Sequence, residues 1–490
     1  MQTTVIRNAD YVIAWDAAAG SHAYLEGADV AFRDNEFTFV GKGYAGPADK
    51  EISGRGLMVM PGLVNIHSHP SSEPGNKGLL EELGSPRLGQ SSLYEFMPIF
   101  RLDPEAARAA TMVAMSELLK SGVTTIADLS GARDGWADDL ASTGLRGVLC
   151  PMFRSASWTT TNGHSVEYHW DEAAGKKAMQ KALDLIDAAA KHPSGRISGM
   201  VGPSQIDTCT EELIRDSYAA AQERGIAMQI HAAQSVVEFN EITRRHGKTP
   251  IEWLDSLGVL GPDAIIGHGI FLNDHPWLHW PHGDDFGLLR DSGASVAHCP
   301  TVFSRRGIAL NWVSRYAQAG INLGLGTDTF PHNMIDEMRM ACLAARILKG
   351  DFKGASTAEV FTAATVGGAK ALKKPDIGRV AIGAKADFSL VDLSHPYMQP
   401  LREPLRSLIY STSDRAIKDV YVDGQQVVKD GQVLTIDVEA AIDTLRAAQA
   451  RTVATVSERD WAKRQIEDMS PMVFPVQATV SAPKPVSKSA

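Results

Sequence analysis

Residues 57–69 read LMVMPGLVNIHSH, and this stretch carries the fold prediction. Its apolar and β-branched residues are typical of a buried strand, which ends on two histidines separated by one serine. Side chains two residues apart lie on the same face of a strand, so His67 and His69 project together. The stretch therefore predicts a strand that delivers two imidazoles to one point at its carboxyl end.

Seven similar runs follow, and amphipathic helical stretches lie between many of them. The strand candidates are 123–129, 145–153, 197–202, 226–232, 264–269, 294–299 and 321–328, and the clearest helical stretches are 104–122, 171–192, 211–225 and 334–350. Eight strands with intervening helices predict an α/β fold with a closed parallel (β/α)8 barrel over residues 57–372. In such a barrel the chemistry lies at the carboxyl ends of the strands.

The two ends of the chain have a different pattern of apolar and polar residues. Residues 1–56 alternate apolar and polar residues between Gly, Asp and Asn, and residues 373–470 contain β-rich runs separated by Asp-Gly turns. We expect both ends to pair in one β domain, with a closing helix in the second segment. Residues 471–490 are rich in Pro, Ser and Ala and predict a flexible tail.

Composition narrows the class of function. The 490 residues carry 58 acidic and 48 basic side chains, a net charge of -10, without a basic cluster. This balance argues against nucleic acid and anionic membranes as partners and favours a small-molecule substrate. The four widely spaced cysteines form no CxxC pair and are typical of buried thiols in a reducing compartment, so we expect a cytoplasmic protein.

Four residues at strand ends form a candidate metal site. His67 and His69 are joined by His231, which ends the run AMQIHA, and by Asp328, which ends LGLGTD. Three imidazoles and one carboxylate suit a single divalent ion, with zinc foremost and Fe(II) or Mn as alternatives. His268 ends the next strand and is expected beside the metal, where it would stabilise developing charge on the substrate.

Taken in order, these motifs carry a family resemblance. The chain resembles the amidohydrolase superfamily, in its branch of triazine hydrolases, chlorohydrolases and cytosine-type deaminases, through PGLVNIHSH, His231, GHGIFL, AHCPT, LGLGTDT and GAKADFSLVDLSHP. The resemblance implies a distorted barrel with a β-sandwich built from both chain ends, and homodimers or larger homo-oligomers. The strand ISGMVG ends without the lysine that two-metal relatives use, which implies one metal.

The chain departs from that branch at three places. Deaminases of the branch usually have a glutamate three residues after the strand-five histidine, and Gln234 stands here. A pocket histidine is replaced by Ser204 with Asp207 expected at the rim, and Phe303 and Arg305 follow HCP where relatives commonly have Ser-Asn. An amide exchanges no protons at neutral pH, so Gln234 removes the usual acid/base of ring deamination and is left as a substrate hydrogen-bonding group.

Two loops are candidates for covering the site. The long segment 70–96 contains Glu73, Lys77 and Tyr94, and it could act as a lid. The segment 157–170 carries Trp158 among other aromatic side chains. For each of these residues taken singly, an ordinary surface position is the favoured reading.

These residues together predict a metal-dependent hydrolase of C–N bonds. Asp328 would take a proton from the attacking water and pass it to the leaving nitrogen, which suits an amide, urea, carbamate or cyclic amide. Dechlorination or deamination of an N-heterocycle, such as a triazine or pyrimidine, is the alternative. A non-catalytic barrel scaffold is the alternative of another class, and such a scaffold would contain no stoichiometric metal.

Overall fold

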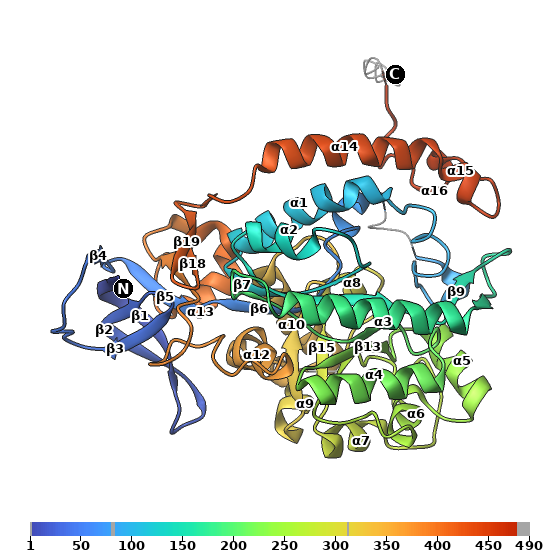
Figure 1. Cartoon of the computed structure of the whole chain (residues 1–490), viewed down its shortest axis with the longest axis horizontal. Helices are drawn as coiled ribbons and strands as arrows, with labels where there is room; N and C mark the ends of the chain where they lie inside the picture. Colours follow the sequence, from blue (N-terminus) through green and yellow to red (C-terminus); the bar gives the residue numbers. More distant parts are fainter. Residues whose placement is uncertain (1, 80–83, 311–312, 478–490) are drawn as a thin grey trace, which may run out of the picture.

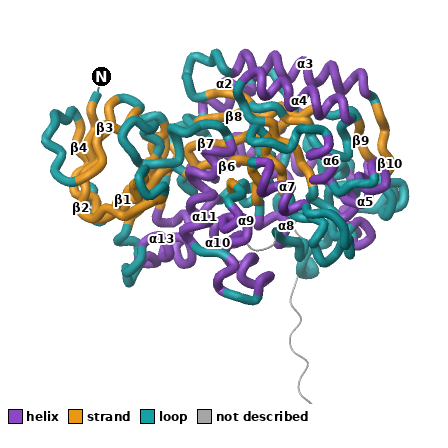
Figure 2. Tube along the Cα trace, turned by 90° about the horizontal axis from the view of Figure 1, so that it is seen from below, coloured by secondary structure: helices purple, strands orange, loops and turns teal. Residues whose placement is uncertain are grey.

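The computed structural model describes residues 2–79, 84–310 and 313–477. Short parallel strands form its centre, helices flank them, and a separate sheet lies at one end (Figures 1 and 2). The central strands form two sheets with the orders β11-β8-β7-β6 and β13-β14-β15-β16, and β12 pairs with β8. Their bounds are β6 Leu63–Ser68, β7 Val123–Ser130, β8 Arg146–Phe153, β11 Ile197–Gly199, β12 Gly202–Pro203, β13 Met228–Ala232, β14 Ala264–His268, β15 Ser295–His298 and β16 Asn322–Leu325.

Isolated bridges join the two parallel sheets at both edges. Ser68 at the end of β6 pairs with Asp328 after β16, and Gln205 after β12 pairs with His231 in β13. The parallel α/β arrangement predicted from the sequence is confirmed, whereas full closure of the barrel by regular ladders stays a prediction. The bridges matter for function because they draw strand ends from both sheets together.

Helices flank the strands, and they include the four helical stretches predicted from the sequence at 104–122, 171–192, 211–225 and 334–350. In order they are α1 Ala107–Lys120, α2 Trp136–Ser142, α3 Glu172–Ala189, α4 Glu211–Arg224, α5 Val236–His246, α6 Pro250–Ser256, α7 Asp285–Ser292, α8 Pro300–Ser304, α9 Val313–Ala319, α10 Met334–Lys349, α11 Thr357–Thr362 and α12 Gly368–Ala371. The local causes are clear in α4, where Thr210 caps the first turn and Gly225 ends the helix at φ +63°. None of the described helices is long and apolar enough to cross a bilayer.

Both chain ends contribute to a single mixed sheet of nine strands. Its strands are β1 Thr3–Asp16, β2 Ser21–Arg33, β3 Glu36–Gly41, β4 Lys50–Ser53, β5 Leu57–Pro61, β17 Phe388–Asp392, β18 Ile417–Val422, β19 Gln425–Lys429 and β20 Gln432–Val433. Phe388 stacks on Tyr421 with ring centroids 4.6 Å apart, and Phe32 and Phe37 pack beside them. Pairing of the two ends is therefore confirmed. The sandwich arrangement stays a prediction, because the hydrogen bonds define one continuous sheet.

The remaining elements are peripheral. The hairpin of β9 (Ala156–Thr159) and β10 (Glu167–Trp170) extends from the barrel region, and α13 (Pro404–Ser407) precedes β18. Helix α14 (Val438–Ala454), followed by the short α15 (Val456–Arg459) and α16 (Ile466–Met469), lies along α1 (Figure 1). Residues 471–477 are largely exposed, and the rest of the expected tail, 478–490, lies outside the described residues.

A buried ion pair joins the parallel sheet to the nine-stranded sheet. The Arg146 guanidinium, at the start of β8, donates to both carboxylate oxygens of Asp387 at 2.9 and 3.0 Å and to Asp423 at 2.9 Å. Burial alone would lower the pKa of Arg146, but the two carboxylates outweigh it and raise the pKa. The bidentate geometry fixes the relative position of the two sheets.

We expect Arg146→Ala to lower the free energy of unfolding by about 3–5 kcal/mol, because it leaves the buried Asp387 carboxylate without its partner. Chemical denaturation measures the change. The control is Arg290→Ala, which removes an exposed pair with Asp291 and should change stability by less than about 1 kcal/mol. Equal effects of the two substitutions would contradict the structural role of Arg146.

Candidate metal centre

Strand ends from both parallel sheets meet at one point. His67 lies in β6 and His69 follows it, His231 lies in β13, and His268 ends β14. Asp328 follows β16 and is tied to the first histidine pair by backbone hydrogen bonds, from Asp328 N to His67 O and from His69 N to Asp328 O, both 2.9 Å. The residues that the sequence singled out as strand-end groups are therefore brought together.

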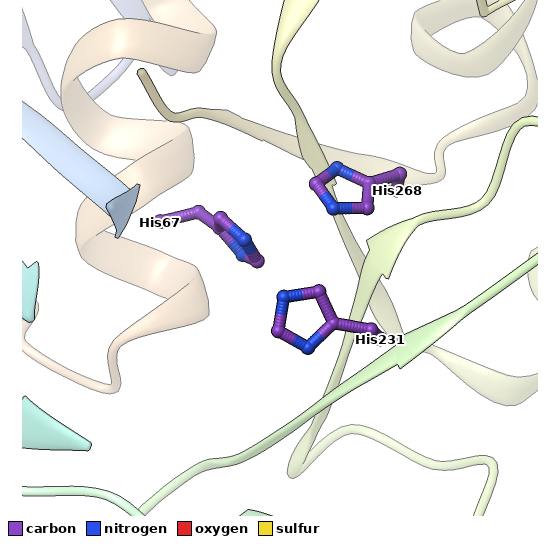
Figure 3. A group of neighbouring side chains, drawn as sticks. All are labelled: His67, His231 and His268. Carbon is purple, nitrogen blue, oxygen red and sulfur yellow. The ribbon is translucent and has the colours of Figure 1, made fainter. Parts of the chain in front are cut away.

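The ligand atoms of these residues converge. The distances are 3.2 Å from His69 Nε2 to Asp328 Oδ1, 3.7 Å from His67 Nε2 to the same oxygen, 3.3 Å from His231 Nε2 to His69 Nε2, and 3.8 Å from His268 Nε2 to Asp328 Oδ2. Figure 3 shows His67, His231 and His268 turned toward one another. Among the described residues, two overlapping groups could hold a metal ion: His67 with His231 and His268, and His67 with His69 and Asp328.

The second nitrogen of each proposed histidine ligand is held by an oxygen acceptor. Nδ1 of His69 contacts the Leu129 carbonyl at 2.7 Å, and Nδ1 of His231 contacts the Ser204 carbonyl at 2.5 Å. Nδ1 of His67 contacts Gln229 Oε1, and the Gln229 amide is oriented by its own hydrogen bond to Ile66 O. These acceptors keep the proton on Nδ1, so the lone pair of each imidazole lies on Nε2, as a metal site requires.

The same arrangement is unfavourable without a cation. Nε2 of His69 lies 3.3 Å from Nε2 of His231 and 3.2 Å from Asp328 Oδ1, so in the absence of a metal ion a proton occupies His69 Nε2 near neutral pH. Nε2 of His67 is fully buried and has no hydrogen-bond partner among the described residues. A buried nitrogen without a partner is costly, and a divalent ion satisfies all three nitrogens at once. The donor set therefore fits a metal.

The pKa shifts keep most of these side chains in the protonation state that binds a metal ion. Burial lowers the pKa of His231 to about 3 and of His268 to about 4, and it lowers that of His67 well below its ordinary value. Burial would raise the pKa of Asp328, but the hydrogen bond from His69 and the neighbouring imidazoles hold it well below its usual range. Burial would lower the pKa of His69, but the hydrogen bond and the negative charge of Asp328 outweigh it and raise the pKa to about 8.

Close packing and strained backbone hold the site together. A Cβ atom on Gly326, just after β16, would lie 2.6 Å from Cβ of His67, so only glycine lets this segment approach β6. Asp328 has φ +58° and His268 has φ +148°, conformations that non-glycine residues rarely adopt. Such outliers persist where the surrounding structure enforces them, which is common at functional sites.

The residues at which the chain departs from the family pattern also lie around the metal centre. Gln234 is buried, and its Nε2 has no hydrogen-bond partner among the described residues. Asp207 was expected at the rim, but it is fully buried, because it accepts hydrogen bonds from Tyr168 at 2.8 Å and from Tyr94 at 3.4 Å. Phe303 is buried, and its ring centroid lies 4.6 Å from that of the His268 ring.

Some loop residues are not the surface positions that the sequence favoured. Tyr94 and Glu73 are buried, and Trp158 packs against Tyr94 with centroids 5.4 Å apart. Burial raises the pKa of Glu73 to about 7, and its charge acts on His69 and Asp328. Arg305 lies over the Phe330 ring at 4.5 Å.

Sequence reasoning missed the residues that orient the ligands. Gln229 had a usable signal, since it lies two residues before His231 and so on the same strand face. The carbonyl acceptors of Leu129 and Ser204 had none, because any residue type supplies a backbone oxygen. His298 ends β15 and is buried, and burial lowers its pKa to about 3.

Comparisons with known proteins agree with this geometry. A profile of the Amidohydrolase family matches residues 58–427. A 5'-deoxyadenosine deaminase of Methanosphaera stadtmanae is 30% identical over 82% of this chain and 90% of its own length. An adenosine deaminase structure from Xanthomonas campestris with bound zinc has a TM-score of 0.78 at 23% identity, covering 92% of this chain and 98% of that one. An atrazine chlorohydrolase from Arthrobacter aurescens in complex with zinc has a TM-score of 0.76 at 22% identity, covering 91% and 100%.

The parallel α/β fold and the histidine-aspartate cluster define a metal-dependent hydrolase. The profile match spans most of the chain, and the chain belongs to the amidohydrolase family. It is an enzyme that acts on carbon-nitrogen bonds other than peptide bonds.

The orientation of the imidazoles leads to a prediction about metal content. We expect His67→Ala, His231→Ala and Asp328→Ala to lose stoichiometric metal, because each removes a converging ligand atom. Gln229→Ala should keep the ligands but weaken metal affinity by about 10- to 100-fold, because His67 loses the acceptor that fixes its tautomer. Elemental analysis and chelator competition measure both effects. Full metal content in all three ligand variants would contradict the assignment.

The pKa of His69 predicts how metal affinity depends on pH. Below about pH 8 the metal-free His69 is protonated, so a zinc ion must displace that proton. Affinity should therefore rise about tenfold per pH unit up to pH 8 and level off above it. The other imidazoles are already neutral and add no slope in this range. Zinc titration against a competing chelator, with proton release measured by calorimetry, tests this, and a pH-independent affinity would contradict it.

Proposed function

We propose that this chain hydrolyses a C–N bond of a small molecule with one divalent metal, zinc foremost and Fe(II) or Mn as alternatives. His67, His69, His231 and Asp328 are the proposed ligands, and His268 is the proposed neighbour of the reacting atoms. The observation that carries the proposal is the convergence of the Nε2 atoms of three imidazoles, each with its Nδ1 hydrogen-bonded, beside one carboxylate.

The chain's own groups can move the protons that hydrolysis needs. A bound divalent metal lowers the pKa of a water molecule, which makes it a nucleophile near neutral pH. Asp328 stays ionised and has a second oxygen, Oδ2, directed toward His268, so it can accept a proton and return it to a leaving nitrogen. His268 stays neutral because of burial, and one ring N–H can donate to an oxygen that gains negative charge.

The preferred substrate class is an amide, urea, carbamate or cyclic amide. Gln234 supports this preference, because a buried amide can hydrogen-bond a substrate but cannot exchange protons with a ring nitrogen and a departing amine. The second candidate is deamination or dechlorination of an N-heterocycle. It is favoured by the deaminases and the chlorohydrolase to which the chain is similar.

Further proposals concern organisation. We propose residues 57–372 as a closed catalytic barrel, 1–56 with 373–470 as a composite β-sandwich domain, and 471–490 as a tail. The enzyme would work as a homodimer or larger homo-oligomer in the cytoplasm. The four cysteines are buried and unpaired, which agrees with a reducing compartment.

A product-resolved screen tests the substrate class. Zinc-loaded enzyme is incubated with amides, ureas, carbamates and with aminated and chlorinated heterocycles, while amine, ammonia and chloride are measured separately. We expect release of amine from the first group to dominate, since Asp328 alone can carry the proton. Gln234→Glu should raise ammonia release from aminated rings, because it restores a group that titrates.

The matched control is Gln234→Ala, which removes the amide without adding an acid. It should lower turnover of the preferred substrate and leave ring deamination low. Wild-type enzyme that releases ammonia from an aminated ring faster than it cleaves any amide or urea would overturn the preference for the first class. If the purified protein contains no stoichiometric metal and is insensitive to chelators, the non-catalytic barrel scaffold is indicated instead.

A further inference from the structure

The segment before α1 places a tyrosine between two segments of the metal centre. Tyr94 is buried, and its hydroxyl lies 3.2 Å from Ser235 Oγ and donates to Asp207 Oδ2 at 3.4 Å. Ser235 caps α5, four residues after the proposed ligand His231. Asp207 follows β12, three residues after Ser204, whose carbonyl accepts from Nδ1 of His231. One hydroxyl therefore joins the segment that follows His231 to the segment that supplies its acceptor.

These polar groups form a chain of hydrogen bonds with a consistent direction. Ser235 Oγ accepts from Glu238 N at 3.1 Å, so its own proton is available to the Tyr94 oxygen. Burial raises the pKa of Tyr94, so the hydroxyl keeps the proton that it donates to Asp207. The same Asp207 oxygen accepts from Tyr168 at 2.8 Å. Burial raises the pKa of Asp207 as well, and Oδ2 accepts whether or not Oδ1 carries a proton.

The residue next to Tyr94 is held by the C-terminal helices. Glu95 Oε1 accepts from Trp461 Nε1 at 3.1 Å and from Arg464 Nη2 at 2.9 Å. The Arg464 guanidinium is fixed in turn by Asp460, at 2.6 and 2.9 Å, and lies 5.4 Å from the centroid of the Trp461 ring. Because Tyr94 and Glu95 are adjacent in a buried segment, the contacts of Glu95 also restrict where the Tyr94 hydroxyl lies.

Helices α14 to α16, residues 438–469, form an arm that lies along α1 (Figure 1). The arm also holds the far end of the segment around Glu95, because Arg459 Nη1 donates to the Arg101 carbonyl at 2.9 Å. An apolar cluster joins the two parts, and its buried members are Phe96, Ile99, Phe100, Val456 and Met469. The arm is therefore both packed against the segment that carries Tyr94 and hydrogen-bonded to it.

We propose that Tyr94 is a positioning residue of the metal centre and that the arm holds Tyr94 in place through Glu95. The hydrogen bonds of Tyr94 reach Ser235 and Asp207, so it acts on His231 through the segments that carry them. Loosening the arm should let these two segments separate and should speed the loss of a bound metal ion. This inference rests on the proposed function only for the metal, because the coupling itself lies within the polypeptide.

The competing interpretation is that the arm only completes the hydrophobic core. In that case, removing its hydrogen bonds to Glu95 would lower the stability of the whole chain or have no effect. The contact between residues 204–207 and 231–235 would then change no more than the rest of the structure. A positioning role instead predicts a local change in these two segments while the thermal unfolding temperature stays close to that of the wild type.

Two sets of substitutions separate these interpretations. Tyr94→Phe removes the hydroxyl and keeps the ring. The arm variant combines Trp461→Phe with Arg464→Gln, which removes both donors to Glu95 and leaves the apolar cluster intact. The matched control is Arg446→Gln, which removes an exposed ion pair on the same arm. Arg464→Lys alone keeps a positive charge beside Glu95 and should behave like the wild type more closely than Arg464→Gln does.

Amide hydrogen exchange of the full-length protein measures the contact between the two segments. The amide of Ile206 donates to His231 O at 3.0 Å, and the amide of His231 donates to Ser204 O at 3.2 Å, so both amides report on this contact. We expect Tyr94→Phe and the arm variant each to speed their exchange about 3- to 10-fold, as the loss of one buried hydrogen bond does. Arg446→Gln should leave the exchange unchanged.

The rate of zinc release gives a second readout on the zinc-loaded protein. Transfer of zinc to excess dipicolinate should become about 3- to 10-fold faster in Tyr94→Phe and in the arm variant, because His231 is held less firmly. The combination of all three substitutions should release zinc no faster than Tyr94→Phe alone, since the arm acts through Tyr94.

Several results would overturn the proposal. One is unchanged exchange of the two amides in either variant, and another is that the effects of the arm variant and of Tyr94→Phe on zinc release simply add. Faster exchange throughout the chain, with an equally lowered unfolding temperature, would assign the arm to the core alone. If the local exchange changes as expected but the protein binds no zinc, the coupling to the arm stands and the proposed metal-dependent function fails.

Discussion

The centre of this enzyme depends on one constraint: each proposed histidine ligand must have its Nδ1 proton held by an oxygen. His67, His69 and His231 receive that acceptor from Gln229, Leu129 and Ser204. With Nδ1 occupied, Nε2 of each imidazole is the atom that points inward, and a metal ion bound there would replace the proton that His69 carries below about pH 8. Three histidines close together are not enough for a metal site; their tautomers must also leave Nε2 available, and the Nδ1 acceptors ensure this.

The acceptors themselves depend on how the strands meet. The Ser204 carbonyl is in place because Gln205 bridges to His231, and Asp328 is in place because Ser68 bridges to it. Gly326 lets the backbone after β16 come close to His67. The seam between the two parallel sheets is therefore where the ligands of the site converge, and regular strand pairing is interrupted there in favour of site geometry.

Two further side chains outside the proposed ligand set lie close to the metal centre. Gln234 is buried in the segment after β13, and Phe303 of α8 packs against the His268 ring. Family membership accounts for the ligands and for the hydrolytic class. We expect the substrate to depend on these surrounding side chains, because the chain departs there from the pattern of the deaminases that it resembles.

The sequence by itself determined the class of fold, the pairing of the two chain ends and the residues that could hold a metal. These features follow from local periodicity and from the position of His67, His231 and Asp328 at strand ends, which a linear pattern records directly. The buried state of Asp207 could not be predicted, because its partners Tyr94 and Tyr168 lie far away in the chain. The acceptors of the imidazoles could not be predicted either, since the positions of backbone carbonyls around the site are set only once distant strands have met.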